Sequence, residues 1–236
     1  MLTFNFHGKN SYIDFGIYVE KRPTITSPKR RVDYITIPAR NGSLKYDENT
    51  YEDITITLEC AIKGDVTSIS DIKAWLLSNA SGELYFSYDL GKVYKAQVVN
   101  SIDFEIILRR FSKFIIVFNA EPFMYLTSPI RFEYPLENGE NEVNLVNIGT
   151  VYSEPTFEIT AQGNVNIKIN DSIIKLSNMQ RKVFISSSLK EVYSEADENM
   201  NHLMEGEFPV LELGKNIINV TGDVSEFIIH PNWRWL

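Results

Sequence analysis

The stretch KRPTITSPKRRVDYITIPARNGSLKYDENTYEDITITLECAI, residues 21–62, combines a basic loop, a turn and a strand pattern. Its first eleven residues hold five Lys and Arg side chains and no acid. Its last ten residues alternate apolar and polar positions in the way that a half-buried β-strand does. An Asn-Gly pair at residues 41–42 marks a tight turn between these two parts. The stretch therefore predicts a β domain that carries a basic loop.

Short runs rich in Ile, Val, Thr, Tyr and Phe continue this pattern through the first half of the chain. They cover residues 34–39, 83–89, 93–99, 104–111 and 113–120. Cys60, the only cysteine, falls in one of the strands, where a small buried side chain is expected. The first half is thus expected to be mainly β.

One segment of the first half has helical rather than strand spacing. Apolar residues stand at i, i+3 and i+4 from Ile72, and Gly82 follows the segment. Ser70 or Asp71 is expected to cap the N-terminus of this short amphipathic helix. We expect Trp75 to face the core rather than to stack on a ligand.

The strand pattern is interrupted at residues 120–142 by three prolines and an acidic turn, which places a domain boundary between residues 135 and 136. Beyond it, Val165, Ile167 and Ile169 alternate with polar residues, and Asp171-Ser172 is expected to supply the turn of a hairpin. Further strands are expected at residues 181–189, 209–214, 216–222 and 226–233. Their spacing is typical of a β-sandwich.

The charge is unevenly divided between the two parts. Residues 1–135 carry 16 Lys and Arg against 16 Asp and Glu, whereas residues 136–236 carry 7 against 15, so the net charge of -8 lies in the second part. Such a part would repel phosphate, which disfavours nucleic acid as its partner and favours protein. No run approaches the roughly 18 apolar residues that a membrane span needs.

The sequence offers little catalytic or metal-binding chemistry. The three histidines are scattered, and none has a second ligand at a metal-binding spacing. The Gly-x-Ser-x-Gly, Gly-x-x-x-x-Gly-Lys and Gly-x-Gly-x-x-Gly motifs are all absent from the sequence. We therefore expect no enzyme activity, no cofactor and no metal.

Three stretches, in order, resemble siphophage distal tail proteins. Residues 21–62 resemble the N-terminal domain of that family, in which a strand that ends in a Pro-Gly/Ala-Arg-Asn/Asp-Gly-Ser element precedes a Tyr-x-Asp type strand; Ala39 stands where the family often has Gly. Residues 147–170 are similar to the opening of that family's C-terminal domain, with a Gly-Thr-x-x-Ser-x-Pro element at 149–155. Residues 206–222 are similar to its closing segment. No long insertion of the kind that carries extra carbohydrate-binding modules is present.

The resemblance implies two β-rich domains: a ring-forming domain with one short helix at residues 1–135, and a galectin-like β-sandwich at residues 136–236. It implies a homo-hexameric ring in the virion tail, made in the bacterial host cytoplasm. The ring would be a structural hub that joins the tail tube protein to the tail-associated hub protein and to receptor-binding or baseplate proteins. DNA would pass through it without specific binding. A phage, a prophage or a tail-like bacteriocin could encode such a chain.

In a ring, each contact joins two different patches of neighbouring subunits, so a basic loop that faces acidic groups would favour closure. On this ground we expect the subunit interface to include Lys29, Arg30, Arg31, Arg40, Asn41 and Gly42. The second interpretation of these residues is a solvated loop that contacts no partner. Lining of the DNA channel is the third, because a basic wall would retain phosphate.

Two other classes of function stay open. A carbohydrate-binding module would use exposed aromatic rings, for which Trp233 and Trp235 are the natural candidates. Alternation places both on one face of an expected final strand, where burial is an equal alternative. A wall-degrading enzyme is disfavoured, because the neighbouring carboxylates lie in loops and lack the separation that a catalytic pair needs.

Overall fold

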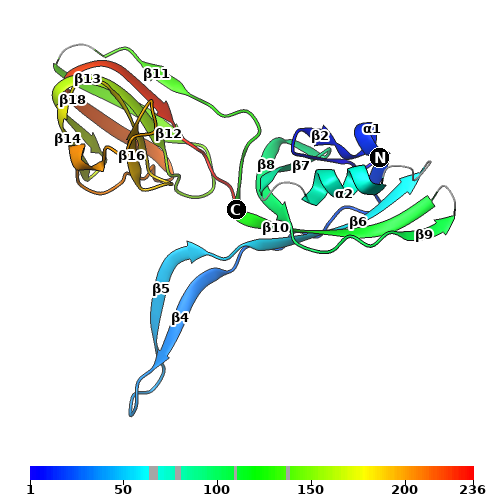
Figure 1. Cartoon of the computed structure of the whole chain (residues 1–236). Coiled ribbons are helices and arrows are strands. Elements are labelled where there is room, and N and C mark those ends of the chain that lie inside the picture. Colours follow the sequence, from blue (N-terminus) through cyan, green and yellow to red (C-terminus); the bar gives the residue numbers. More distant parts are fainter. Residues whose placement is uncertain (64–68, 78–80, 109–110, 137–138) are drawn as a thin grey trace. The chain divides into compact units, whose positions relative to one another are not determined.

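The computed structural model describes residues 1–63, 69–77, 81–108, 111–136 and 139–236 (Figure 1). The chain divides into two compact units, residues 1–127 together with Leu236, and residues 128–235. Strands dominate both units, which confirms the mainly β fold class. The units divide a few residues before the expected domain boundary at 135/136, and independent folding on either side of that boundary stays a prediction.

The first unit is built around an antiparallel sheet in the order β2-β1-β7-β8-β10-β6-β3, with β9 paired to β10. A bridge between Leu2 and Val19 joins the chain before β1 to β3, so that the sheet curls back on itself. The strands are β1 (Phe4–Phe6), β2 (Lys9–Asn10), β3 (Ile17–Val19), β6 (Ile54–Lys63), β7 (Gly82–Phe86), β8 (Asp89–Val98), β9 (Glu105–Leu108) and β10 (Phe111–Leu126).

Two helices accompany this sheet. Helix α1 (Ser11–Phe15) is capped by the side chain of Asn10, which accepts hydrogen bonds from two backbone amides of the first turn. Helix α2 spans Ile69–Leu77, so the expected short helix exists, but Ser70 and Asp71 lie inside its first turn and cannot be its N-cap. The apolar spacing located the buried face, whereas the helix begins two or three residues earlier than expected, at Ile69.

The core of the first unit gathers around Trp75, which is 5% exposed, as the sequence predicts. Its ring stacks on Phe15 at 4.4 Å and on Phe4 at 5.7 Å between centroids. Its indole nitrogen donates a hydrogen bond of 2.9 Å to the carbonyl oxygen of Phe6. Cys60 is buried as expected, and burial raises the pKa of its thiol. Trp75 therefore ties α2 to α1 and β1.

The second unit is an eight-stranded antiparallel sheet in which long β13 and β18 pair along most of their length. Its strands are β11 (Phe132–Tyr134), β12 (Gly139–Asn147), β13 (Thr156–Ile169), β14 (Ser172–Met179), β15 (Lys182–Ser186), β16 (Glu191–Ser194), β17 (Met204–Glu205) and β18 (Gly214–His230), with a 3₁₀ turn at Asn201–Leu203.

Strands β13 and β18 change neighbours halfway along. The first part of β13 pairs with β15 and the second with β14, while β18 pairs first with β12 and then with β11. Register shifts near Gly163, which has a φ of 74°, mark the change. These bulges bend the two strands, so their buried faces contribute to one shared core.

Three details of the second unit differ from the sequence expectations, while the buried positions agree. Val165, Ile167 and Ile169 are buried as predicted, but the hairpin turn is Asn170-Asp171, because Ile169 pairs directly with Ser172. The separate strands expected at 216–222 and 226–233 form the single strand β18, which ends at His230. The expected strand at 209–214 makes one bridge, between Leu211 and Ser153.

A tight loop at residues 147–153 explains the Gly-Thr element of the sequence. Buried Asn147 accepts a hydrogen bond from the amide of Gly149 and donates to the carbonyl oxygens of Val151 and Leu211. A Cβ atom on Gly149 would lie 2.3 Å from the backbone carbonyl oxygen of Arg234. The loop therefore needs glycine because another backbone segment occupies the space of a side chain.

We predict that Gly149→Ala lowers the free energy of unfolding by about 2 kcal/mol or more, because backbone must move to admit the methyl group. Chemical unfolding followed by circular dichroism measures the change. Gly91→Ala is the matched control, because a Cβ atom at Gly91 meets no atom within 4 Å. Equal stability of the two variants would contradict this account of the loop.

Candidate functional site

The six expected interface residues lie on or next to a β-hairpin that forms a sheet of its own. Its strands are β4 (Arg30–Thr36) and β5 (Ser43–Tyr51), and Figure 1 shows them extending away from the main sheet of the first unit. Residues 43–51 are not among the strands expected from the sequence. The strand was missed because nearly all of its residues are exposed, so no apolar face produced an alternating pattern.

The hairpin exposes large apolar side chains. Tyr34 is 68% and Tyr46 is 59% exposed, and the cross-strand pair Ile35 and Leu44 is 50% and 44% exposed. By strand alternation, Ile35, Leu44 and Tyr46 share one face of the hairpin, and Tyr34 lies on the other face. A two-stranded hairpin is only marginally stable in water, and exposed apolar groups offer surface for an interaction. The hairpin thus presents a surface that a protein partner can cover.

Arg30 fastens the base of the hairpin. Its Nε donates to Oδ1 of Asp47 at 2.8 Å, and a terminal nitrogen donates to the side-chain oxygen of Asn49. The hydrogen bond from Arg30 lowers the pKa of the Asp47 carboxyl group below its ordinary value, and the amide of Asn49 adds to this effect. Arg30 therefore links β4 to β5 within one chain.

Lys29 is also paired within the chain. Its Nζ lies 3.1 Å from Oε1 of Glu52, while the amide of Glu52 donates to the carbonyl oxygen of Lys29 at 2.8 Å. Both side chains of this ion pair are largely exposed, so solvent screens it. Lys29 and Arg30, which were expected to contact acidic groups of a neighbouring subunit, thus form ion pairs with acidic residues of their own chain.

The other four expected residues behave differently. Arg31 and Arg40 are exposed, and neither makes an ion pair within the described part of the chain. Arg40 lies with Asn41 and Gly42 at the tip of the hairpin, whereas Arg31 lies near its base. At about 3.3 Å per residue, the length of β4 separates the two groups by about 20 Å. The structure therefore spreads the six residues along the hairpin instead of gathering them in one cluster.

The tip turns at Pro38-Ala39, where the amide of Arg40 donates to the carbonyl oxygen of Ile37 at 3.2 Å. Ala39 has a φ of 63°, in the left-handed region that favours glycine. Gly42, at a φ of 76°, completes the return into β5. The position at which this chain has Ala in place of the more usual Gly is therefore one where the backbone itself favours Gly.

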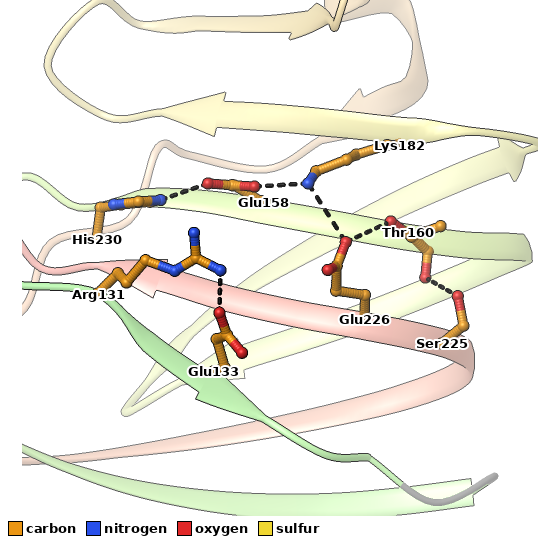
Figure 2. Close-up of polar contacts among 8 residues, drawn as sticks. All are labelled: Arg131, Glu133, Glu158, Thr160, Lys182, Ser225, Glu226 and His230. Carbon is orange, nitrogen blue, oxygen red and sulfur yellow. Dashed lines mark hydrogen bonds and ion pairs between the residues drawn. The ribbon is translucent and has the colours of Figure 1, made fainter.

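A second group of polar residues crosses one face of the sheet in the second unit (Figure 2). Lys182 on β15 contacts Glu158 at 2.7 Å and Glu226 at 3.3 Å. His230 Nε2 lies 2.5 Å from the other carboxylate oxygen of Glu158, and Arg131 pairs with Glu133 beside β11. Thus β15, β13 and β18 are joined by side chains as well as by backbone.

Glu158 is the centre of this network. Burial alone would raise the pKa of its carboxyl group, but hydrogen bonds from Lys182 and His230 outweigh burial and lower the pKa. Lys182 in turn has its pKa raised, chiefly by its hydrogen bond to Glu158. Each of the two carboxylate oxygens of Glu158 thus contacts a basic side chain from a neighbouring strand. The network fastens the sheet.

The described residues contain no group of three or more His, Cys, Asp or Glu side chains arranged to hold a metal ion. Trp233 is 3% exposed and packs into the second unit, so its ring is closed to a sugar. The chain beyond His230 is not a strand at residues 231–234, which overturns the expected placement of both Trp side chains on a final strand. In the described ranges, no helix has the length and apolar character required to span a bilayer.

We predict that Ala39→Gly slows amide hydrogen exchange in β4 and β5, whereas Ala39→Val speeds it. Gly tolerates positive φ, while a β-branched side chain there adds about 1 kcal/mol or more of strain. Hydrogen exchange read by mass spectrometry resolves the hairpin from the rest of the first unit. Identical exchange of the Val variant and the parent chain would show that the turn does not hold Ala39 in the left-handed region.

Comparison with known proteins agrees with this architecture. Residues 8–120 match the family described as the phage tail protein RIFT-related domain. The chain is also similar to the SPP1 Dit (gp 19.1) protein, described as a paradigm of the hub adsorption apparatus in phages that infect Gram-positive bacteria. That similarity has a TM-score of 0.69 at 13% identity and covers 97% of each chain. A search of curated protein sequences gave no match.

The family match covers the part of the chain that holds the hairpin and most of the first sheet. The structural similarity extends through the second unit as well. Together they confirm the resemblance drawn from the sequence motifs. Residues 8–120 are therefore similar to the phage tail protein RIFT-related domain, and the chain as a whole has the fold of the SPP1 Dit protein.

Proposed function

We propose that this protein is a structural hub of a phage tail tip. Six copies form a ring that joins the tail tube to the tail-associated hub protein and to receptor-binding or baseplate proteins. DNA passes through the ring without specific binding. The protein is made in the cytoplasm of the bacterial host and is assembled into the virion tail, and its role is structural rather than enzymatic.

The observation that carries this proposal is the similarity to SPP1 Dit along 97% of both chains, because it includes both units and their order. A match limited to one β domain would fit many functions, since common folds host unrelated activities. The phage tail domain at residues 8–120 independently supports a role in the tail.

The hairpin supplies the ring contact in this proposal. A cyclic ring needs two different complementary patches on each subunit. Tyr34, Ile35, Leu44 and Tyr46 offer apolar surface, and Arg31 and Arg40 offer charges that are unpaired among the described residues. Lys29 and Arg30 contribute indirectly, because they hold the hairpin in shape.

The distribution of charge favours the same arrangement. Residues 1–135 are neutral overall, whereas residues 136–236 carry a net charge of -8. Close packing of six acidic units would be opposed by their mutual repulsion, while six neutral units meet no such opposition. Contacts through the first unit are therefore the electrostatically favoured way to close a ring.

We predict that the double variant Arg31→Glu/Arg40→Glu assembles less than the parent chain. A hexamer has a light-scattering mass of about 163 kDa, six times the 27.1 kDa of one chain. The variant replaces attraction to a neighbour by repulsion at every contact of the ring. Added salt should weaken assembly of the parent chain in the same direction, because exposed charges are screened within about 10 Å at 0.1 M ionic strength.

Lys168→Glu/Lys215→Glu makes the same change of charge on exposed residues of the second unit and is the matched control. Circular dichroism verifies that each variant is folded. If the parent chain forms hexamers and the hairpin variant forms them equally well at every salt concentration, the charges of the hairpin are simply solvated. A parent chain that stays monomeric at all concentrations would argue against self-assembly into a ring.

A further inference from the structure

A pocket of about 270 Å³ in the first unit lies beside the basic stretch that precedes β4. Arg22 lines it from that stretch, Tyr88 from the turn between β7 and β8, and Lys92 and Tyr94 from β8. Phe86 and Met124 complete its apolar wall. The pocket belongs neither to the hairpin surface nor to the network of Figure 2, and the hub proposal gives it no task.

Arg22 is held in a position suited to binding an anion. Its guanidinium group lies over the ring of Tyr88 at 3.9 Å, and this ring stacks in turn on Phe86 at 5.2 Å. Stacking covers a face of the guanidinium plane and leaves its N–H edges available as donors. Arg22 makes no ion pair with any residue that the structure describes.

The Tyr88 hydroxyl is the second unused donor. Its oxygen is buried and makes no hydrogen bond of good geometry with a described residue. Arg22 lies close enough to donate to this oxygen, but a guanidinium group cannot accept the hydroxyl proton. Burial raises the pKa of this hydroxyl, and the neighbouring Arg22 only partly opposes that effect, so the group keeps its proton at neutral pH. A buried hydroxyl left without a partner is costly, which favours a ligand that accepts a hydrogen bond.

The charged residues that line the pocket favour an anionic ligand. The apolar wall of the pocket restricts the chemical class of that anion. Arg22 and Lys92 outnumber Asp89, the one acid of the lining. The rings of Phe86 and Tyr94 and the side chain of Met124 offer no strong polar contact to the rest of the ligand. The forked guanidinium group matches the two oxygens of a carboxylate.

We propose that this pocket binds a carboxylate on a short apolar stem, with Arg22 and the Tyr88 hydroxyl as donors to its oxygens. An Asp or Glu side chain of a second copy, or a free small carboxylate, has this chemistry. The binding chemistry does not depend on the hub function, since both proposed donors lie within the first unit.

Calorimetric titration of the full chain with butyrate, acetate and inorganic phosphate, as sodium salts at equal ionic strength, tests the proposal. We expect butyrate to bind more tightly than acetate or phosphate. Arg22→Gln should weaken butyrate binding about tenfold or more, because a charge-assisted pair is lost, and Tyr88→Phe should weaken it by a smaller factor. Lys21→Gln is the control, because Lys21 is the neighbouring cation and pairs with Glu59.

Three results would overturn the proposal: absence of butyrate binding, unchanged binding by the folded Arg22→Gln variant, or tighter binding of phosphate than of butyrate. Light scattering in saturating butyrate distinguishes the two sources of the ligand. A lower mass supports a side chain of a second copy as the natural ligand, and an unchanged mass supports a free carboxylate. Calorimetry measures ligand binding to the pocket whether or not a ring forms. A failure of the hub proposal would therefore be distinguishable from a failure of the pocket proposal.

Discussion

Apolar side chains are most stable when they are removed from water, and the β4–β5 hairpin is where this chain leaves several large ones exposed. Elsewhere in the first unit, the curled sheet and α2 enclose Trp75 and the rings around it. The hairpin has only two strands, so neither of its faces is covered by another layer. Arg30 and Asp47 hold its strands together, but they cannot bury Tyr34 or Tyr46. The ring contact proposed above would bury these side chains.

The sequence predicted the parts of the fold in which burial alternates along a strand. Residues 54–62 and Val165, Ile167 and Ile169 have such a pattern, and the structure confirms them. Strand β5 is solvated on both faces and has no comparable pattern. The continuity of β18 depends on tertiary pairing with β13, so no local signal could separate one bent strand from two short ones.

The candidate site could be located from sequence only as a stretch. The sequence shows that this stretch is basic and lies near a turn. The partners of Arg30, however, depend on the register in which β4 pairs with β5. The pocket beside it had no sequence signal, because Arg22 and Tyr88 lie far apart along the chain and meet only through the fold. Charge and spacing in the sequence identify candidate interface residues. The pairing of strands then decides whether a charged side chain forms an ion pair within the chain or remains available to a partner.

The central claim is that six copies close into a ring, and electron microscopy images of the purified full chain at several protein concentrations test it most directly. Class averages viewed down the symmetry axis should show six-fold particles with a central hole, since the proposed ring lets DNA pass. Compact particles without a hole, or open chains of subunits, would contradict the account. In that case the hairpin would serve a contact other than ring closure.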